Sequence, residues 1–177
     1  FSKMQPNLKD SKMAYVTYDK AKWHWGAANA PTDIPQENGA THIAFFFRWC
    51  MERKLYSKDF AADFADDIAR MDDSFDYRQY FFDAMDGVLS SEELNTAGKA
   101  FANAYYTTDR TKFAKMHGWY LQDYDDFVAR KFGEKNFDNA YFYIENSPQN
   151  YAEIKEIIDR RYEEFLETKN SSKSADK

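Results

Sequence analysis

The sequence contains a single cysteine, Cys50, among its 177 residues. One cysteine excludes an intramolecular disulfide and a cysteine-rich zinc site, and it is consistent with a reducing compartment. Cys50 itself lies in an apolar stripe, which predicts a core side chain rather than a nucleophile. We therefore expect a cytoplasmic protein that is stabilised by its hydrophobic core.

Long apolar runs and glycine clusters are missing as well. No stretch approaches the roughly 18 to 20 consecutive apolar residues that span a bilayer, and the first residues carry no signal-peptide pattern. The six glycines stand apart from one another, which excludes a Walker loop, a dinucleotide fingerprint and a nucleophile elbow. The sequence therefore predicts neither a membrane partner nor glycine-rich phosphate binding.

Histidines are few, and their spacing is not that of a metal site. His24, His42 and His117 are the three in the chain, and none belongs to an HxxxH or HxxE pattern on one helix face. His42 is surrounded by aromatic residues, where we expect a neutral imidazole that donates a hydrogen bond. The sequence predicts no metal and no cofactor.

Negative charge is plentiful, and it is concentrated in one segment. The net charge is −6, and residues 58–86 hold nine aspartates against three basic residues. Such a surface repels nucleic acid and attracts basic partners. The residues predicted to bind a partner are Asp59, Asp63, Asp66, Asp67, Asp72 and Asp73.

The composition predicts one all-α domain. Aromatic residues make up 19% of the chain, and the length suits a single core. We expect a compact domain of about six helices and at most one short strand over residues 14–168. Residues 1–13 are expected to be a disordered segment or an artificial extension, and residues 169–177 a disordered tail.

Apolar spacing and capping residues give the expected elements. Helices are predicted at 35–54, 57–71, 74–86, 90–105, 108–132 and 147–168, of which 108–132 is either bent or divided in two. The candidate strand is 139–145, because aromatic residues cluster there without helical spacing.

The segment AKWHWGA, residues 21–27, has two possible roles. In an extended segment both indoles point the same way and pack against the helix that holds Trp49, as a structural plug. The alternative is a pocket where burial tunes a histidine for acid–base chemistry. Facing imidazoles in an open pocket favour the second role, and two separately satisfied buried rings exclude it. The pocket residues are Trp23, His24, Trp25, His42 and Trp49.

Four segments together resemble a family of small bacterial domains of unknown function. They are YDKAKWHW (18–25), DIPQENGATHIAFFFRW (33–49), DGVLSSEELNTAGKAFANAYY (86–106) and IDRRYEEF (158–165). The resemblance covers residues 14–168 and departs from the family in the aspartate-rich segment. The family-typical positions are Trp23, His24, Thr41, His42, Asp86, Gly87, Asn95, Gly98, Tyr105 and Tyr106.

The resemblance implies a role near polymorphic toxins. Members look like accessory proteins encoded beside toxins and secretion systems, which implies an immunity function. Together with the acidic segment, it leads us to expect a non-enzymatic protein that binds and neutralises a basic toxin domain. The alternative is an enzyme or small-ligand-binding protein with the Trp/His pocket. A scaffold that oligomerises through exposed tyrosines stays a third possibility, and the sequence leaves the oligomeric state open.

Overall fold

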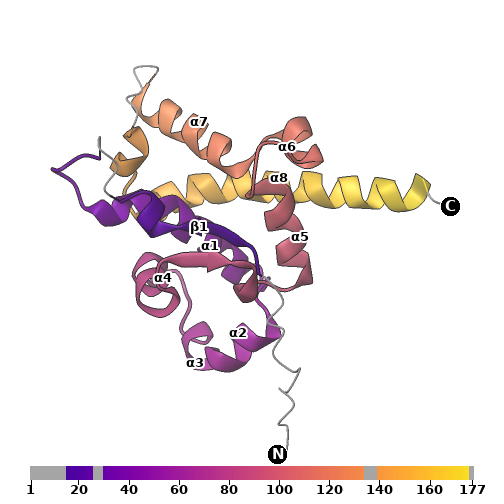
Figure 1. Ribbon diagram of the computed structural model, residues 1–177, viewed down its shortest axis with the longest axis horizontal. Helices are drawn as coiled ribbons and strands as arrows, with labels where there is room; N and C mark the ends of the chain where they lie inside the picture. The colour runs from indigo at the N-terminus through magenta and orange to yellow at the C-terminus, as the bar shows by residue number, and fades with distance from the viewer. Residues whose placement is uncertain (1–14, 26–29, 134–138, 176–177) are drawn as a thin grey trace, which may run out of the picture.

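The computed structural model describes residues 15–25, 30–133 and 139–175, and α1 (Thr41–Glu52) lies at its centre (Figure 1). All residues of α1 except Arg48 and Glu52 are buried. Because apolar side chains cover most of its circumference, the helix has to be enclosed by neighbours on several sides. The helix predicted at 35–54 is present, with η2 (Gln36–Ala40) as its 3₁₀ first turn.

The expected fold class is confirmed: the described chain forms a single compact, mainly helical domain. It also contains two short antiparallel strands, β1 (Thr17–Lys20) and β2 (Val88–Ser90), where at most one strand was expected. The candidate strand at 139–145 is instead the 3₁₀ helix η4 (Ala140–Tyr143). Strand pairing between segments so distant along the chain leaves no local pattern in the sequence.

The acidic segment folds into short helices. Ser57 caps α2 (Lys58–Asp63) by accepting a hydrogen bond from the backbone of Phe60. The helix expected at 57–71 is broken at Phe64, and α3 (Ala65–Ile68) follows. Helix α4 (Tyr77–Met85) is capped by Asp76. Figure 1 shows α2 and α3 on the opposite side of α1 from α7.

The capping box at Ser90 and Glu93 is present, but it opens the 3₁₀ turn η3 (Ser91–Glu93). Helix α5 (Thr96–Tyr105) begins later, with Asn95 as its own cap. The chain then forms α6 (Lys112–His117) and α7 (Tyr120–Phe132). The 108–132 region is thus two helices, divided at a glycine with a positive φ of 111°.

Helix α8 (Pro148–Ala175) packs against α1, α5, α6 and α7. It continues through residues 169–175, where a disordered tail was expected, and its end extends beyond the other helices (Figure 1). The hydroxyls of Ser171, Ser172 and Ser174 donate to carbonyls four residues earlier, so they add bonds along these exposed turns. Residues 1–13 lie outside the described residues. Among the helices described, none combines the length and apolar character that crossing a bilayer demands.

Candidate functional site

Asp19 on β1 is the centre of a buried polar cluster. Its side chain is 5% exposed. One oxygen, Oδ1, lies 2.8 Å from the backbone nitrogen of Lys20 and 3.0 Å from Nε2 of His24. The other, Oδ2, lies 3.1 Å from Nε2 of His42 and 2.8 Å from the hydroxyl of Tyr106. One carboxylate therefore joins β1, the start of α1 and the end of α5.

The charge state of Asp19 fixes the tautomers of both histidines. Burial by itself raises the pKa of Asp19, but the hydrogen bonds from His24 and His42 outweigh it, so the pKa lies well below its ordinary value. An ionised carboxylate only accepts hydrogen bonds, so each Nε2 atom carries a proton. In a neutral imidazole the opposite atom, Nδ1, is then a hydrogen-bond acceptor.

Local backbone structure brings the two imidazoles together. The 3₁₀ helix η1 (Ala21–Trp23) turns the chain directly after β1, so that His24 folds back toward Asp19. His42 lies in the first turn of α1, and its side chain is 3% exposed. The ring centroids of His24 and His42 are 4.6 Å apart, with an interplanar angle of 84°. The two rings thus meet edge to face.

A cavity of about 240 Å³ adjoins both rings; we call it the imidazole cavity. Two of its lining residues, His42 and Tyr124, each have a buried polar atom, Nδ1 and the hydroxyl, with no hydrogen-bond partner among the described residues. The hydroxyl of Tyr141 lies 3.4 Å from Nδ1 of His24. The lining residues are His24, His42, Leu121, Tyr124, Asp125 and Tyr141.

Burial shifts the protonation equilibria around this cavity. It lowers the pKa of His42 below the ordinary value, in spite of the neighbouring Asp19. It also raises the pKa of Asp125 and that of Tyr141. At neutral pH the imidazole of His42 is therefore uncharged, and its Nδ1 is a hydrogen-bond acceptor without a partner among the described residues.

The three tryptophans predicted to line the pocket lie elsewhere. Trp23 is 57% exposed, and its ring makes a cation–π contact with the Lys20 ammonium group. Trp25 is 45% exposed and stacks on Phe82. Trp49 is fully buried and donates its indole N–H to Asp159 at 2.8 Å. The structural plug is not formed either, because the 3₁₀ turn of η1 replaces the extended segment on which that interpretation depended.

Comparison with known proteins gives one match. A family model described as a domain of unknown function, DUF7832, matches residues 17–139. The chain belongs to this family. No curated protein and no solved structure matches it. The segment that matches DUF7832 contains Asp19 and both histidines, whereas Tyr141 and α8 lie outside it.

The predicted site did not include four polar residues of the observed cluster, Asp19, Tyr106, Tyr124 and Tyr141, although Tyr106 was among the family-typical positions. Asp19 and Tyr106 lie within segments that carry the resemblance, YDKAKWHW and the AYY end of the long block. These two segments and THIAFFF meet at one carboxylate. The presence of polar residues in all three of these segments was the feature that could have indicated Asp19 and Tyr106. No local sequence pattern marks Tyr124 or Tyr141.

Three of the six aspartates predicted to bind a partner have exposed carboxylates that make no ion pair or hydrogen bond with the described residues. They are Asp59, Asp63 and Asp66. Asp59 and Asp63 border a groove of about 640 Å³ together with Glu92 and Glu93. We call these three aspartates the acidic surface.

The other three predicted aspartates bond to the protein's own side chains. Asp67 pairs with Arg70 and accepts a hydrogen bond from Tyr80 at 3.1 Å. Asp72 accepts from Ser74, both at the backbone and at the hydroxyl.

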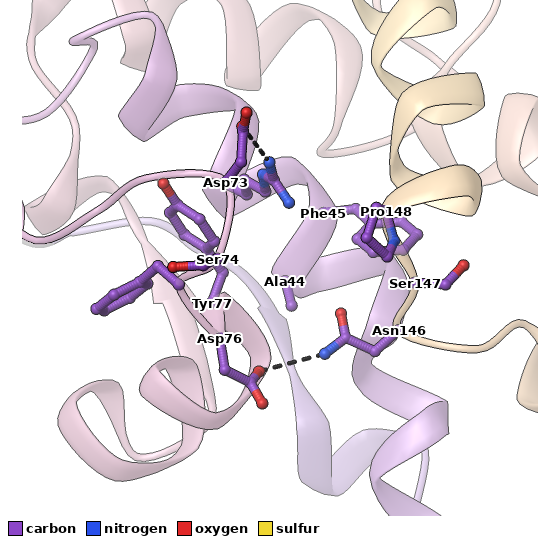
Figure 2. Close-up of a pocket in the computed structure, with 11 residues that line it drawn as sticks. Ala44, Phe45, Asp73, Ser74, Asp76, Tyr77, Asn146, Ser147 and Pro148 are labelled. Carbon is purple, nitrogen blue, oxygen red and sulfur yellow. Dashed lines mark hydrogen bonds and ion pairs between the residues drawn. The ribbon is translucent and has the colours of Figure 1, made fainter.

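Asp73 pairs with Arg48 at 3.1 Å beside a cavity of about 190 Å³ (Figure 2). Figure 2 also shows Asn146 reaching Asp76 across this cavity, at 3.2 Å. Polar side chains across this cavity thus bond to one another, whereas His42 and Tyr124 at the imidazole cavity each keep an unpartnered polar atom among the described residues.

Proposed function

We propose that this DUF7832 protein binds a small polar molecule in the imidazole cavity. The observation that carries the proposal is the pair of buried, unpartnered polar atoms, Nδ1 of His42 and the hydroxyl of Tyr124, at one cavity. Leaving such an atom unsatisfied costs about 1 to 3 kcal/mol. A ligand that donates to Nδ1 and also bonds to the hydroxyl would recover this cost for both atoms.

The lining narrows the class of ligand. A volume of about 240 Å³ is below the roughly 300 to 1,000 Å³ of drug-sized sites, which favours a small molecule. Tyr124 and Tyr141 offer aromatic faces, and Asp125 adds a carboxylate. Aromatic faces and a carboxylate both attract cations. The cavity therefore suits a small amine or amide that presents N–H groups.

The same geometry would support proton transfer if the ligand is a substrate. An imidazole held by a carboxylate at one nitrogen and unpartnered at the other resembles the arrangement of a general base. In this chain Asp19 orients His42 through Nε2, and Nδ1 is the atom that would take the proton.

A panel of small primary amines and amides tests the ligand proposal. Chemical-shift changes in ¹H–¹⁵N NMR spectra should map to the backbone around Leu121 and Tyr124. Leu121→Trp, which fills the cavity, should abolish them, and Tyr124→Phe should weaken binding by roughly tenfold because one hydrogen bond is lost. Leu166→Trp, at an exposed leucine of α8, is the matched control. Shift changes that persist in Leu121→Trp would contradict the proposal.

Toxin neutralisation is the second candidate, and the free carboxylates of the acidic surface favour it. Asp59, Asp63 and Asp66 lie on α2 and α3, on the opposite side of α1 from α7 and its cavity residues (Figure 1). A basic toxin domain bound there would leave the imidazole cavity unchanged. The resemblance to toxin-associated proteins supports the same partner.

Association kinetics test this second candidate. Changing Asp59, Asp63 and Asp66 to lysine should slow association with the toxin encoded nearest to the gene by at least roughly tenfold at low salt. The matched control is the triple lysine variant of the exposed Glu156, Glu163 and Glu167 on α8. Equal slowing in both variants would show that net charge alone matters and that the acidic surface is not the docking site.

A further inference from the structure

We propose that Asp19, His24 and His42 bind a divalent transition metal, with Zn²⁺ as the first choice. A carboxylate oxygen and one nitrogen of each ring lie within 4.8 Å of one another. This site uses the Nε2 side of the rings, whereas the ligand proposal uses Nδ1. The metal proposal therefore goes beyond the ligand proposal and does not depend on it.

The distances already approach those of a coordination sphere. Zinc binds histidine nitrogen and carboxylate oxygen at about 2.0 to 2.2 Å, which separates neighbouring ligand atoms of a tetrahedral site by about 3.4 Å. Nε2 of His24 and Nε2 of His42 lie 3.0 and 3.1 Å from the two oxygens of Asp19. One ligand atom from each of the three residues lies within 4.8 Å of the others, so small side-chain rotations would bring all three around one ion.

Neighbouring groups hold the three ligands in place. The backbone N–H of Lys20 and the hydroxyl of Tyr106 both donate to the Asp19 carboxylate. Metal-bound histidines usually bond through their other ring nitrogen as well. The Tyr141 hydroxyl near Nδ1 of His24 is positioned for that role. Two of the three ligands, Asp19 and His24, therefore already have hydrogen-bond partners outside the metal site.

The ligand set also suggests the kind of metal site. Two histidines and one carboxylate from the protein leave a tetrahedral position for water, as in catalytic rather than structural zinc sites. Metal binding requires that each Nε2 gives up its proton, which a neutral imidazole does by moving the proton to Nδ1. The ion would therefore turn the Nδ1 atoms of both rings from acceptors into donors.

Calorimetric titration of tag-free, full-length protein with ZnCl₂ tests the site. We expect one Zn²⁺ per chain, and visible d–d absorption bands when Co²⁺ replaces it. His24→Gln and Asp19→Asn should weaken binding by more than about 100-fold, and Tyr106→Phe, which removes an outer partner, by about 10- to 100-fold. His117→Gln is the matched control, because this third histidine pairs with Glu164 instead.

The Tyr106→Phe variant keeps the test decisive if the ligand variants fail to fold, which circular dichroism would reveal. Binding that is unchanged in Tyr106→Phe and in folded His24→Gln would overturn the proposal, as would the absence of heat and of Co²⁺ bands in the wild type. Leu166→Trp, at an exposed leucine of α8, should leave Zn²⁺ affinity unchanged, and the amine panel tests the imidazole cavity separately from the metal titration. Failure of the metal site and failure of the ligand proposal are therefore distinguishable.

Discussion

At the scale of single residues, Asp19 organises the site because its carboxylate has four donors. Two come from imidazoles, one from Tyr106 and one from the backbone of Lys20. A buried charge is tolerated when such hydrogen bonds replace its lost hydration. Asp19 therefore determines the stability of the cluster as well as the direction in which both rings present Nδ1.

Asp19→Asn should lower the free energy of unfolding by about 2 to 4 kcal/mol. The amide group places a donor against at least one Nε2–H, so a hydrogen bond is replaced by a clash of two donors. Urea denaturation measures the change. Tyr106→Phe, which removes one donor and leaves the carboxylate, should cost only about 1 to 2 kcal/mol. A loss below about 0.5 kcal/mol in Asp19→Asn would mean that the carboxylate does not hold the cluster together.

The tautomers of His24 and His42 are themselves measurable. Long-range ¹H–¹⁵N NMR spectra of metal-free protein at neutral pH should show both imidazoles with the proton on Nε2, because that atom faces the Asp19 carboxylate. His117→Gln identifies the signals of the third histidine by their disappearance. A proton on Nδ1 in either ring would contradict the hydrogen-bond arrangement.

At the scale of elements, the sequence predicts what depends on local pattern. The apolar circumference of α1, the cap at Ser57 and the capping box at Ser90 are all present. The pairing of β1 with β2 and the placement of Asp19 depend on contacts between distant segments, which no local pattern encodes. The sequence thus picked out His24 and His42 but missed the carboxylate that joins them.

Glu52 at the end of α1 connects that helix to α8. It accepts hydrogen bonds at 2.7 Å from both Tyr151 and Lys155, and at 2.8 Å from Arg48. Burial alone raises the pKa of Glu52, but the bonds from Lys155, Arg48 and Tyr151 outweigh it and hold the pKa below its ordinary value. The contact between the two helices therefore depends on pH.

Acid should weaken this contact, and Glu52→Gln should remove the effect. Because the folded pKa is lower than the unfolded value of 4.5, the stabilisation is fully present above pH 4.5 and is lost as the pH falls through the folded pKa. Glu52→Gln should cost about 1 to 2 kcal/mol near pH 7 and less near about pH 3.5. Urea midpoints at both values measure this, with the exposed Glu156→Gln as control. An equal loss at both values would show that the carboxylate charge does not matter.

At the scale of the whole molecule, α8 completes a core that the DUF7832 match does not include. The match ends at residue 139, but Ile154, Ile158 and Phe165 of α8 are buried in the core. Arg161 of α8 also forms a bidentate ion pair with the buried Asp123 of α7, in which both N–O distances are 2.8 Å. The segment 17–139 alone would therefore expose both an apolar face and a charge.

Arg161→Ala should destabilise the whole domain, because it leaves the carboxylate of Asp123 buried with the Tyr105 hydroxyl as its remaining side-chain donor among the described residues. Loss of one partner from a buried ion pair costs about 3 to 5 kcal/mol. Thermal and urea denaturation should show one cooperative transition at a lower midpoint. Arg160→Ala, at the exposed neighbouring position, should change stability by less than about 0.5 kcal/mol. Equal effects of the two variants would mean that α8 is held by its apolar face, and that the ion pair contributes nothing to its docking.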